Sequence, residues 1–476
     1  MKRISVIAVA VLALGSLVRA VAAADGAGQS GAYQMSKDYT PPTDPLVLAK
    51  LAQWQDLKFG LLMHWGTYSQ WGIVESWTLC PEKHPWNRRT GPFADDDLAY
   101  KRSYENLITT FNPTKFDPAR WAAAAKAAGM RYVVFTTKHH DGFCMFDTAQ
   151  TDYKITGPAC PFRTNPRANV TKEVFDAFRA QGLVAGAYFS KADWHTPFYW
   201  SPSFPVRDRN NNYDTAQHPE LWRQFKDFTW KQIEELMTGY GPVDILWLDG
   251  GQVRPPRQDI DMSGLAALAR KHQPGLIVVD RSVKGANENY RTPENEVPGK
   301  MLPYPWETCM TMASAWSYKT NDTYKGTCAL IGHLCRIVAR GGNLLLNIGP
   351  GPDGEFDPVA YQRLQEIGAW MQINSEAIYA TRPVAPYERG AYAFTGKRDG
   401  TVYAILLAQD DRSVLPETVS LPAELAAQAG QITLLGYGAL KPGATQDGQT
   451  SISIPADARA RPPCAHAWTF KLAPRP

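Results

Sequence analysis

The sequence predicts an α/β fold in which a (β/α)8-like barrel is followed by a C-terminal antiparallel β-sandwich. Between residues 57 and 378, short apolar segments alternate with amphipathic helical stretches, a pattern typical of a parallel sheet covered by helices. After Arg382-Pro383 the pattern changes to short strand-like segments separated by turns rich in Gly, Pro and Asp. The chain of 476 residues is also longer than one hydrophobic core usually organises. We therefore expect a barrel over residues 51–382 and a sandwich over residues 383–476.

Within the barrel region, apolar runs predict strands and longer amphipathic stretches predict helices. The expected strands are residues 58–64, 130–137, 183–190, 243–248, 276–280 and 343–348. The expected helices are residues 118–129, 174–181, 221–239 and 263–271. So many alternating units favour a closed barrel over an open sheet. In the C-terminal region the expected strands are residues 392–395, 401–407, 418–421, 431–435, 451–454 and 467–471.

The first 24 residues have the layout of a secretory signal peptide. Lys2-Arg3 precede an apolar run from Ile4 to Leu17, and small residues follow as far as Ala24. A membrane anchor fits less well, because the run is short and Arg19 follows it. We expect an exported protein, periplasmic or extracellular, with residues 25–50 as a leader segment before the barrel.

The composition argues against several kinds of partner and site. The formal charge is +4 and no basic run occurs, so nothing indicates a nucleic-acid partner. No later apolar stretch is long enough to span a bilayer, so we expect no membrane partner. The seven cysteines include no Cys-x-x-Cys pair, which leaves a zinc site of that kind without support. Their odd number leaves at least one thiol unpaired.

Candidate functional residues are polar side chains that end apolar strands, because active sites of βα barrels lie at the C-terminal ends of their strands. Such positions are His64, His139-His140, Tyr188, Asp249 and Arg281. Strand alternation places Trp247 and Asp249 on the same face, beside the Gly250-Gly251 pair. A carboxylate there suits a nucleophile or general base. An Asp that only caps the following Asp-Gly turn is an equal alternative.

Two adjacent histidines, His139 and His140, raise the question of a metal ion. Neighbours on a regular strand point to opposite faces, so both can bind one ion only if the strand has already ended. No other metal-ligand spacing is present in the sequence. Hydrogen bonds to substrate hydroxyls are the favoured interpretation, with a structural role as the alternative, and we expect no metal and no cofactor.

Four motifs together resemble the α-L-fucosidases of glycoside hydrolase family 29. They are Lys58-Phe59-Gly60 with His64-Trp65-Gly66, Lys138-His139-His140-Asp141-Gly142-Phe143, Trp247-Leu248-Asp249-Gly250, and Gly341 to Pro350. They occur in the order that the family shows and cover about residues 57 to 383. The C-terminal sandwich also matches that family's usual companion domain.

The resemblance implies a retaining hydrolase of fucosylated oligosaccharides or glycoconjugates that uses two carboxyl groups. It implies Asp249 as the nucleophile and Glu294 as the acid/base, with Glu288, Glu296 and Glu307 as alternatives to Glu294. The region around Glu294 resembles the subgroup that acts on α-1,3/1,4-linked fucose. The implied substrate-binding residues are His64, Glu75, Trp77, His139, His140, Tyr188, Trp247, Arg281 and Trp316.

Two other function classes stay open from the sequence alone. One is a non-catalytic protein that binds fucose or oligosaccharides on the same barrel. The other is a metal-dependent hydrolase that uses His139 and His140. The oligomeric state and the disulfide pairing are not predicted.

Overall fold

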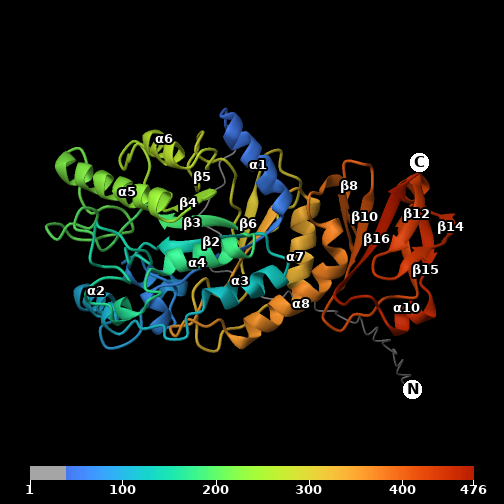
Figure 1. Cartoon of the computed structure of the whole chain (residues 1–476), viewed down its shortest axis with the longest axis horizontal. Coiled ribbons are helices and arrows are strands. Elements are labelled where there is room, and N and C mark those ends of the chain that lie inside the picture. Colours follow the sequence, from blue (N-terminus) through green and yellow to red (C-terminus); the bar gives the residue numbers. More distant parts are fainter. Residues whose placement is uncertain (1–38, 476) are drawn as a thin grey trace, which may run out of the picture.

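The computed structural model describes residues 39–475, and Figure 1 shows an elongated molecule with a parallel α/β part at one end and antiparallel sheets at the other. The predicted signal peptide and most of the predicted leader lie outside the described residues. Helix α1 (Pro45–Leu57) begins within the predicted leader, where Asp44 caps it and Pro45 occupies its first turn. Within the described residues, no helix combines the length and the apolar character that a bilayer crossing requires.

The α/β part is built on one parallel sheet, which confirms the predicted fold class. Its strands are β1 (Phe59–Met63), β2 (Tyr132–Lys138), β3 (Val184–Ser190), β4 (Ile245–Asp249), β5 (Ile277–Asp280), β6 (Glu307–Thr311) and β7 (Asn343–Asn347). Their order is β5-β4-β3-β2-β1-β7-β6, and every neighbouring pair is parallel. The expected strands correspond to β1–β5 and β7, whereas β6 was not expected.

Helices follow the strands and cover the outer face of this sheet, as Figure 1 shows. They are α2 (Asp97–Glu105), α3 (Pro118–Ala127), α4 (Val170–Ala180), α5 (Pro219–Gly239), α6 (Met262–His272), α7 (Thr327–Ala339) and α8 (Pro358–Asn374). Short 3-10 helices occur at Thr67–Gln70, Trp77–Leu79, Pro85–Asn87, Asn106–Thr109, Pro161–Thr164 and Ser375–Ala377. The predicted helices correspond to α3, α4, α5 and α6 within a few residues at each end.

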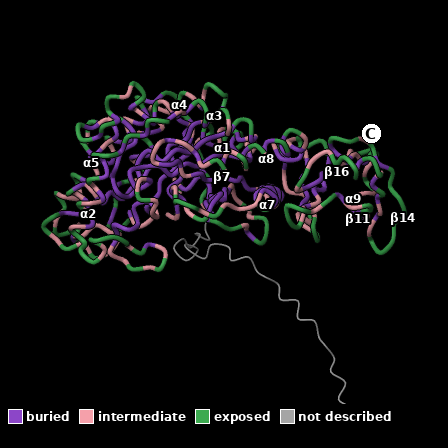
Figure 2. The backbone as a smooth tube through the Cα atoms, turned by 90° about the horizontal axis from the view of Figure 1, so that it is seen from below, coloured by how far each residue is buried: buried purple, intermediate pink, exposed green. Residues whose placement is uncertain are grey.

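Strand side chains alternate between two apolar layers. Leu61, Val133 and Leu246 pack outward in the large cluster shared with the helices. Leu62 and Trp247 point inward and join a second cluster inside the curved sheet. Figure 2 shows that the buried backbone is concentrated in the middle of the α/β part. Residues two positions apart on a strand point to the same face. A residue that follows an inward-pointing side chain by two positions at the strand end therefore points into the space inside the sheet.

The sheet has seven strands in place of the expected eight, because an irregular segment lies between β5 and β6. This segment, Glu288 to Glu294, makes isolated bridges from Glu288 to Val279 of β5 and from Glu294 to Cys309 of β6. Pro293 interrupts the pairing because it has no N–H to donate, although its carbonyl accepts the Cys309 N–H at 3.1 Å. We call this stretch, residues 288–294, the closing segment.

The C-terminal part contains two antiparallel sheets, in agreement with the predicted sandwich. One has the order β13-β12-β16-β10-β9-β8 and the other the order β11-β15-β14. The strands are β8 (Arg382–Arg389), β9 (Tyr392–Gly396), β10 (Val402–Leu407), β11 (Thr418–Pro422), β12 (Ala429–Leu434), β13 (Gly438–Leu440), β14 (Pro442–Gln446), β15 (Gln449–Ser453) and β16 (Ala467–Pro474), with helices α9 (Ala423–Gln428) and α10 (Ala456–Ala460). Phe394 and Trp468 from the first sheet share an apolar cluster with Leu421 and Ile452 from the second.

All seven cysteines lie within the described residues and are free thiols.

Candidate active site

A cavity opens inside the curved sheet, at the C-terminal ends of the parallel strands. Its lining residues are Leu62, His64, Glu75, Trp77, His139, Tyr188, Trp247, Asp249, Arg281, Glu294, Cys309 and Trp316. This set contains every site residue predicted from the sequence except His140. The His140 ring is nonetheless adjacent, with Nε2 at 3.9 Å from Asp249 Oδ2. The structure therefore brings together residues that are as far apart in the chain as Leu62 and Trp316.

Asp249 is the last residue of β4 and is only 5% exposed. Its Oδ2 accepts a hydrogen bond from the Tyr188 hydroxyl at 2.7 Å, and its Oδ1 accepts the backbone N–H of Gly250 at 2.8 Å. Burial acts to raise the pKa of Asp249, but the charge of Arg281, the nearby His140 and the Tyr188 hydrogen bond outweigh it and hold the pKa well below its usual value. The side chain is an ionised carboxylate that also caps its own turn.

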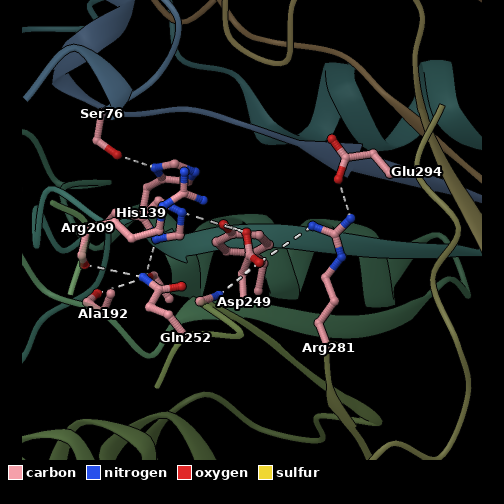
Figure 3. A network of polar contacts seen from close by, with 12 residues as sticks. Ser76, His139, Ala192, Arg209, Asp249, Gln252, Arg281 and Glu294 are labelled. Carbon is pink, nitrogen blue, oxygen red and sulfur yellow. Dashed lines mark hydrogen bonds and ion pairs between the residues drawn. The ribbon is translucent and has the colours of Figure 1, made fainter. Parts of the chain in front are cut away.

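Arg281 lies between Asp249 and Glu294, as Figure 3 shows. Its Nη1 is 3.5 Å from Asp249 Oδ1, and its Nη2 donates a short hydrogen bond to Glu294 Oε2. Nε of the same guanidinium donates to Thr292 Oγ1 at 3.1 Å, which ties Arg281 to the closing segment. One guanidinium group thus separates the two carboxyl groups, so both face the same small space.

Glu294 differs from Asp249 in the direction of its pKa shift. Burial is the largest influence and raises the pKa of Glu294, Arg281 lowers it, and the negative charge of Asp249 raises it. The net result is a raised pKa for Glu294 beside a lowered pKa for Asp249. Two carboxyl groups with opposite shifts are what an acid and a nucleophile need.

The three alternative glutamates lie elsewhere. Glu288 is paired with Arg291, whose Nε is 3.5 Å away. Glu296 is exposed. Glu307 is buried below Trp247, where it accepts hydrogen bonds from Trp247 Nε1 at 3.3 Å and from the Tyr132 hydroxyl at 2.5 Å. Only Glu294 among the four belongs to the residues that line the cavity.

The histidines at the cavity are held in one orientation by hydrogen bonds at Nδ1. His64 donates from Nδ1 to the Asn347 amide oxygen at 2.8 Å, because that oxygen can only accept. His140 Nδ1 lies 2.6 Å from Ser190 Oγ, whose own proton is donated to the Ala192 carbonyl at 2.7 Å. Burial lowers the pKa of His64 and of His140 to about 4, so both rings are neutral at pH 7. Each ring therefore presents Nε2 as an acceptor.

Two loops complete the wall opposite the strand ends. Glu75 Oε1 accepts the Ser317 N–H at 2.9 Å, which ties the loop after β1 to the loop after β6. Burial raises the pKa of Glu75 to about 8, and its backbone has a φ of 30°, an uncommon conformation for a residue other than glycine. The Trp316 ring centroid lies 5.2 Å from that of His64. Trp77, in the 3-10 helix Trp77–Leu79, packs edge-on against His140.

His139, His140 and Asp249 form a cluster with metal-ligand chemistry. Strand β2 ends at Lys138, so the alternation that would separate the two histidines no longer applies. One ligand atom from each of the three residues lies within 4.8 Å of the others. Two imidazoles and a carboxylate are ligands that zinc accepts. Ser76 Oγ lies 2.6 Å from His139 Nδ1. Nδ1 of His139 and Nδ1 of His140 are thus each hydrogen-bonded to a serine, Ser76 and Ser190 respectively.

A family model described as Alpha-L-fucosidase matches residues 27–376 of this chain. The chain belongs to the alpha-L-fucosidase family. It is therefore a glycoside hydrolase with alpha-L-fucosidase activity. The match covers the parallel sheet, its helices and every residue that lines the cavity.

Relatives and solved structures agree with this membership. The tissue alpha-L-fucosidase of Mus musculus is 30% identical, over 91% of this chain and 94% of its own length. The solved alpha-L-fucosidase isoenzyme 1 from Paenibacillus thiaminolyticus superposes with a TM-score of 0.75 at 29% identity, over 90% of this chain and 100% of that one. An alpha-L-fucosidase from Bacteroides thetaiotaomicron, solved as a trapped covalent intermediate with 2-fluoro-fucosyl fluoride, has a TM-score of 0.69 at 23% identity, over 92% and 98% of the two chains, and shows the same fold.

Several residues that shape this fucosidase-family site were not singled out from the sequence. Ser190 and Asn347 end β3 and β7, so the rule that selected Asp249 also applies to them. Cys309, in β6, lines the cavity but belongs to a strand that was not predicted. Ser76 and Ser317 lie on loops, and no local pattern in the sequence marks them as partners of His139 and Glu75.

Proposed function

We propose that the protein is an exo-acting retaining α-L-fucosidase that removes terminal α-linked L-fucose by double displacement, with α-1,3 and α-1,4 linkages in branched oligosaccharides as its preferred substrates. The observation that carries this proposal is the position of Arg281 between Asp249 and Glu294, whose pKa values are shifted in opposite directions. A single guanidinium group between two carboxyl groups is compatible with the separation of about 5–5.5 Å that retaining glycosidases use.

In the first step Asp249 attacks the anomeric carbon of fucose, and Glu294 gives its proton to the departing glycosidic oxygen. The bond from that carbon to the leaving group breaks as the bond to Asp249 forms. The negative charge on Asp249 disappears in this step. Because that charge is one of the influences that raise the pKa of Glu294, the pKa of Glu294 falls when the covalent intermediate forms.

In the second step Glu294, now more acidic, accepts a proton from water while the water oxygen attacks the anomeric carbon. The bond to Asp249 breaks, and fucose leaves with the configuration it had in the substrate. Arg281 and the Tyr188 hydroxyl stabilise Asp249 as a carboxylate before the first step and after the second.

Recognition of fucose rests on the histidines and the aromatic wall. Neutral His64 and His140 offer Nε2 acceptors for sugar hydroxyls, and Arg281 offers donors. We assign Trp316 to the C6 methyl group of fucose and Trp247 to one face of the ring. L-Galactose, which differs from L-fucose only by a hydroxyl at C6, would place that hydroxyl against the same apolar surface without a partner, which costs binding free energy.

The stereochemical outcome and the linkage preference are tested together. Proton NMR during hydrolysis of an aryl α-L-fucoside should show α-L-fucose as the first product, before mutarotation. A panel of oligosaccharides with α-1,2-, α-1,3-, α-1,4- and α-1,6-linked fucose should be hydrolysed fastest at the α-1,3 and α-1,4 linkages. Appearance of the β anomer first contradicts retention, and faster release from α-1,2 or α-1,6 linkages contradicts the subgroup.

The metal-dependent alternative rests on the cluster of His139, His140 and Asp249. Turnover that is insensitive to a chelator excludes it, whereas loss on chelation and recovery with zinc supports it. The non-catalytic alternative is not favoured, because the chain belongs to the alpha-L-fucosidase family and both carboxyl groups line the cavity.

We also propose export, cleavage after Ala24, and a division into a catalytic domain over residues 51–382 and a β domain over residues 383–476. The layout of the first 24 residues supports export. N-terminal sequencing of protein recovered outside the cytoplasm should begin at Asp25. Recovery of the full chain only from the cytoplasm contradicts this assignment.

A further inference from the structure

A second cavity, of about 350 Å³, lies at the N-terminal ends of the parallel strands, the end of the sheet opposite Asp249. Its lining comes from four places that the fold brings together: the end of α1, the stretch before β6, the turn after α7 and the start of β8. The residues are Gln55, Lys58, Met301, Leu302, Pro303, Tyr304, Pro305, Arg340, Gly341, Arg382 and Pro383. None of them lines the candidate active site.

Lys58 is the unusual member of this lining. Its residue is only 1% exposed, yet among residues 39–475 its ammonium group has neither a hydrogen bond nor an ion pair. Its backbone is fixed on both sides, since it ends α1 with a φ of 64° and its carbonyl accepts the Leu344 N–H at 2.8 Å. A buried amine without a partner costs free energy, which a bound anion in the cavity would remove.

The other charges around the cavity are paired. Arg340 is bonded to Glu388, with 2.5 Å between Nη2 and Oε2. Arg382 is bonded to Asp56, with 2.6 Å between Nη1 and Oδ1. Glu388 is shared with Arg336, whose Nε lies 3.0 Å from Oε1, so this group of two arginines and one glutamate keeps a net positive charge. Lys58, when protonated, adds to that excess without a partner of its own, which suits an anionic ligand.

The opposite wall is apolar. Met301, Leu302, Pro303 and Pro305 precede β6, and the Tyr304 ring stacks under the guanidinium of Arg291 at 4.4 Å. An inorganic anion would satisfy Lys58 but would leave this wall without a contact. A carboxylate with a short apolar body would satisfy both. The volume lies at the lower end of the range for small-molecule sites.

We infer that this cavity is a binding site for a small organic monocarboxylate, with Lys58 as the charge partner and residues 301–305 as the apolar wall. The site is independent of the catalytic proposal because it lies at the other end of the sheet. Burial, and next the charge of Arg382, lower the pKa of Lys58 to about 7, while Asp56 acts in the opposite direction. Arg340, Arg336 and the Glu388 that they share are the other charged groups of this neighbourhood. Carboxylate binding should therefore be accompanied by proton uptake at pH 8.

Calorimetric titration of the full chain with hexanoate tests the inference. We expect saturable binding of one hexanoate per chain and a rise in Tm of about 2 °C at ten times the dissociation constant. Titrations at pH 8 in two buffers with different ionisation enthalpies should show proton uptake. Hexanamide, which has the same apolar body without the charge, should bind at least tenfold more weakly. Sulfate at equal ionic strength should not reproduce the rise in Tm.

Two lysine variants form a matched pair for the same titration. Lys58→Met keeps the length of the side chain, removes the charge and should lose at least tenfold in hexanoate affinity. Lys50→Met removes a lysine that lies on α1 and is paired with Asp244, and it should bind as the wild type does. If Lys58→Met does not fold, Arg382→Gln provides the test, because it leaves Asp56 unpaired beside the site and should weaken hexanoate several-fold. The inference is overturned if Lys58→Met or Arg382→Gln binds hexanoate as tightly as the wild type does. It is also overturned if hexanamide binds as tightly as hexanoate, if sulfate raises Tm as much as hexanoate does, or if hexanoate shows no saturable binding.

Discussion

The two proposed catalytic carboxyl groups are carried by very different stretches of backbone. Asp249 ends β4, a strand that is buried along its whole length and paired with β3 on one side and β5 on the other. Glu294 ends the closing segment, which makes isolated bridges only and contains a proline. The sheet positions the nucleophile, whereas a few specific contacts position the acid/base.

The same contrast extends to electrostatics. Both side chains are buried and both contact Arg281, yet the pKa of Asp249 is lowered and that of Glu294 is raised. Asp249 also accepts hydrogen bonds from the Tyr188 hydroxyl and the Gly250 N–H. The negative charge of Asp249, in turn, raises the pKa of Glu294. Burial is the largest influence on both groups; it is outweighed at Asp249, whereas at Glu294 the negative charge of Asp249 adds to it and the pKa stays raised.

Removing the carboxylate of Asp249, at the end of strand β4, should have the largest effect on catalysis. Asp249→Ala should lower kcat for an aryl α-L-fucoside by on the order of 10⁴-fold or more, because no other group can form the covalent intermediate. Steady-state kinetics measure the loss. Asp244→Asn changes a carboxylate that directly precedes the same strand, at the end away from the cavity, and is paired with Lys50 in a partly buried contact; it should stay within about twofold of wild type. Wild-type turnover by Asp249→Ala refutes the assignment.

Removing the carboxyl group of the closing segment should have a smaller effect that depends on the leaving group. Glu294→Ala should lower kcat/KM by about 10²–10⁴-fold for a fucosylated oligosaccharide and by less for an aryl fucoside with an acidic leaving group. Azide should restore turnover by replacing the water that Glu294 activates, giving fucosyl azide. Glu296→Ala, two residues along the chain and exposed, is the control and should be unaffected. If Glu288→Ala shows the azide rescue instead, Glu294 is not the acid/base.

This contrast also explains what sequence reasoning could and could not predict. The rule that functional groups lie at the ends of barrel strands identified Asp249, Tyr188 and Arg281, since each lies at or near the C-terminal end of a regular apolar strand. Glu294 follows no such strand, and only the family resemblance pointed to it. Glu75 is also outside the rule, because its position depends on Ser317, 242 residues away.

The elements that were not predicted have physical reasons as well. Strand β6 reads Glu-Thr-Cys-Met-Thr and lacks the apolar run that marks the other strands. Helix α7 is buried on most of its surface, because it packs between the parallel sheet and strands β8 and β9. Its sequence is therefore apolar along most of its length, and the polar face that marks a surface helix is narrow, with Arg336 near its end. The closing segment replaced an expected eighth strand because Pro293 cannot donate to the pairing.

Removing the arginine that both regions share should shift the pH dependence of catalysis. Arg281 lowers the pKa of Asp249 and that of Glu294, so both pKa values should rise in Arg281→Met. The acidic limb of the kcat/KM profile, which reports ionisation of Asp249, and the alkaline limb, which reports loss of the Glu294 proton, should both move to higher pH. The maximum should fall by about 10²-fold.

The profile is measured with an aryl fucoside, and Arg120→Met serves as the control because Arg120 is paired with Glu355 on the surface. The acidic and alkaline limbs of the Arg120→Met profile should coincide with those of the wild type. Limbs that stay in place in Arg281→Met, or that move in opposite directions, mean that Arg281 does not set the two ionisations.

The smallest expected effect comes from the contact that anchors the end of the closing segment. Asn295 follows Glu294 with a φ of 51°, and its Oδ1 accepts the Thr311 N–H at 3.0 Å. Asn295→Gly keeps the backbone conformation accessible but loses the hydrogen bond, whereas Asn295→Ala loses both. We expect kcat/KM to fall by about threefold for the glycine variant and about tenfold for the alanine variant, since a small displacement of an acid/base is costly.

The loss should lie in kcat and should be larger for an oligosaccharide than for an aryl fucoside, because only the former depends strongly on protonation by Glu294. A loss that is equal for both substrates would mean that Asn295 acts on folding or on fucose binding. The backbone of Asp249, in contrast, is held by the pairing of β4 with β3 and β5. The loss of activity in the Asn295 variants therefore measures how strongly the position of Glu294 depends on one hydrogen bond. The position of Asp249 depends instead on the pairing of β4 within the sheet.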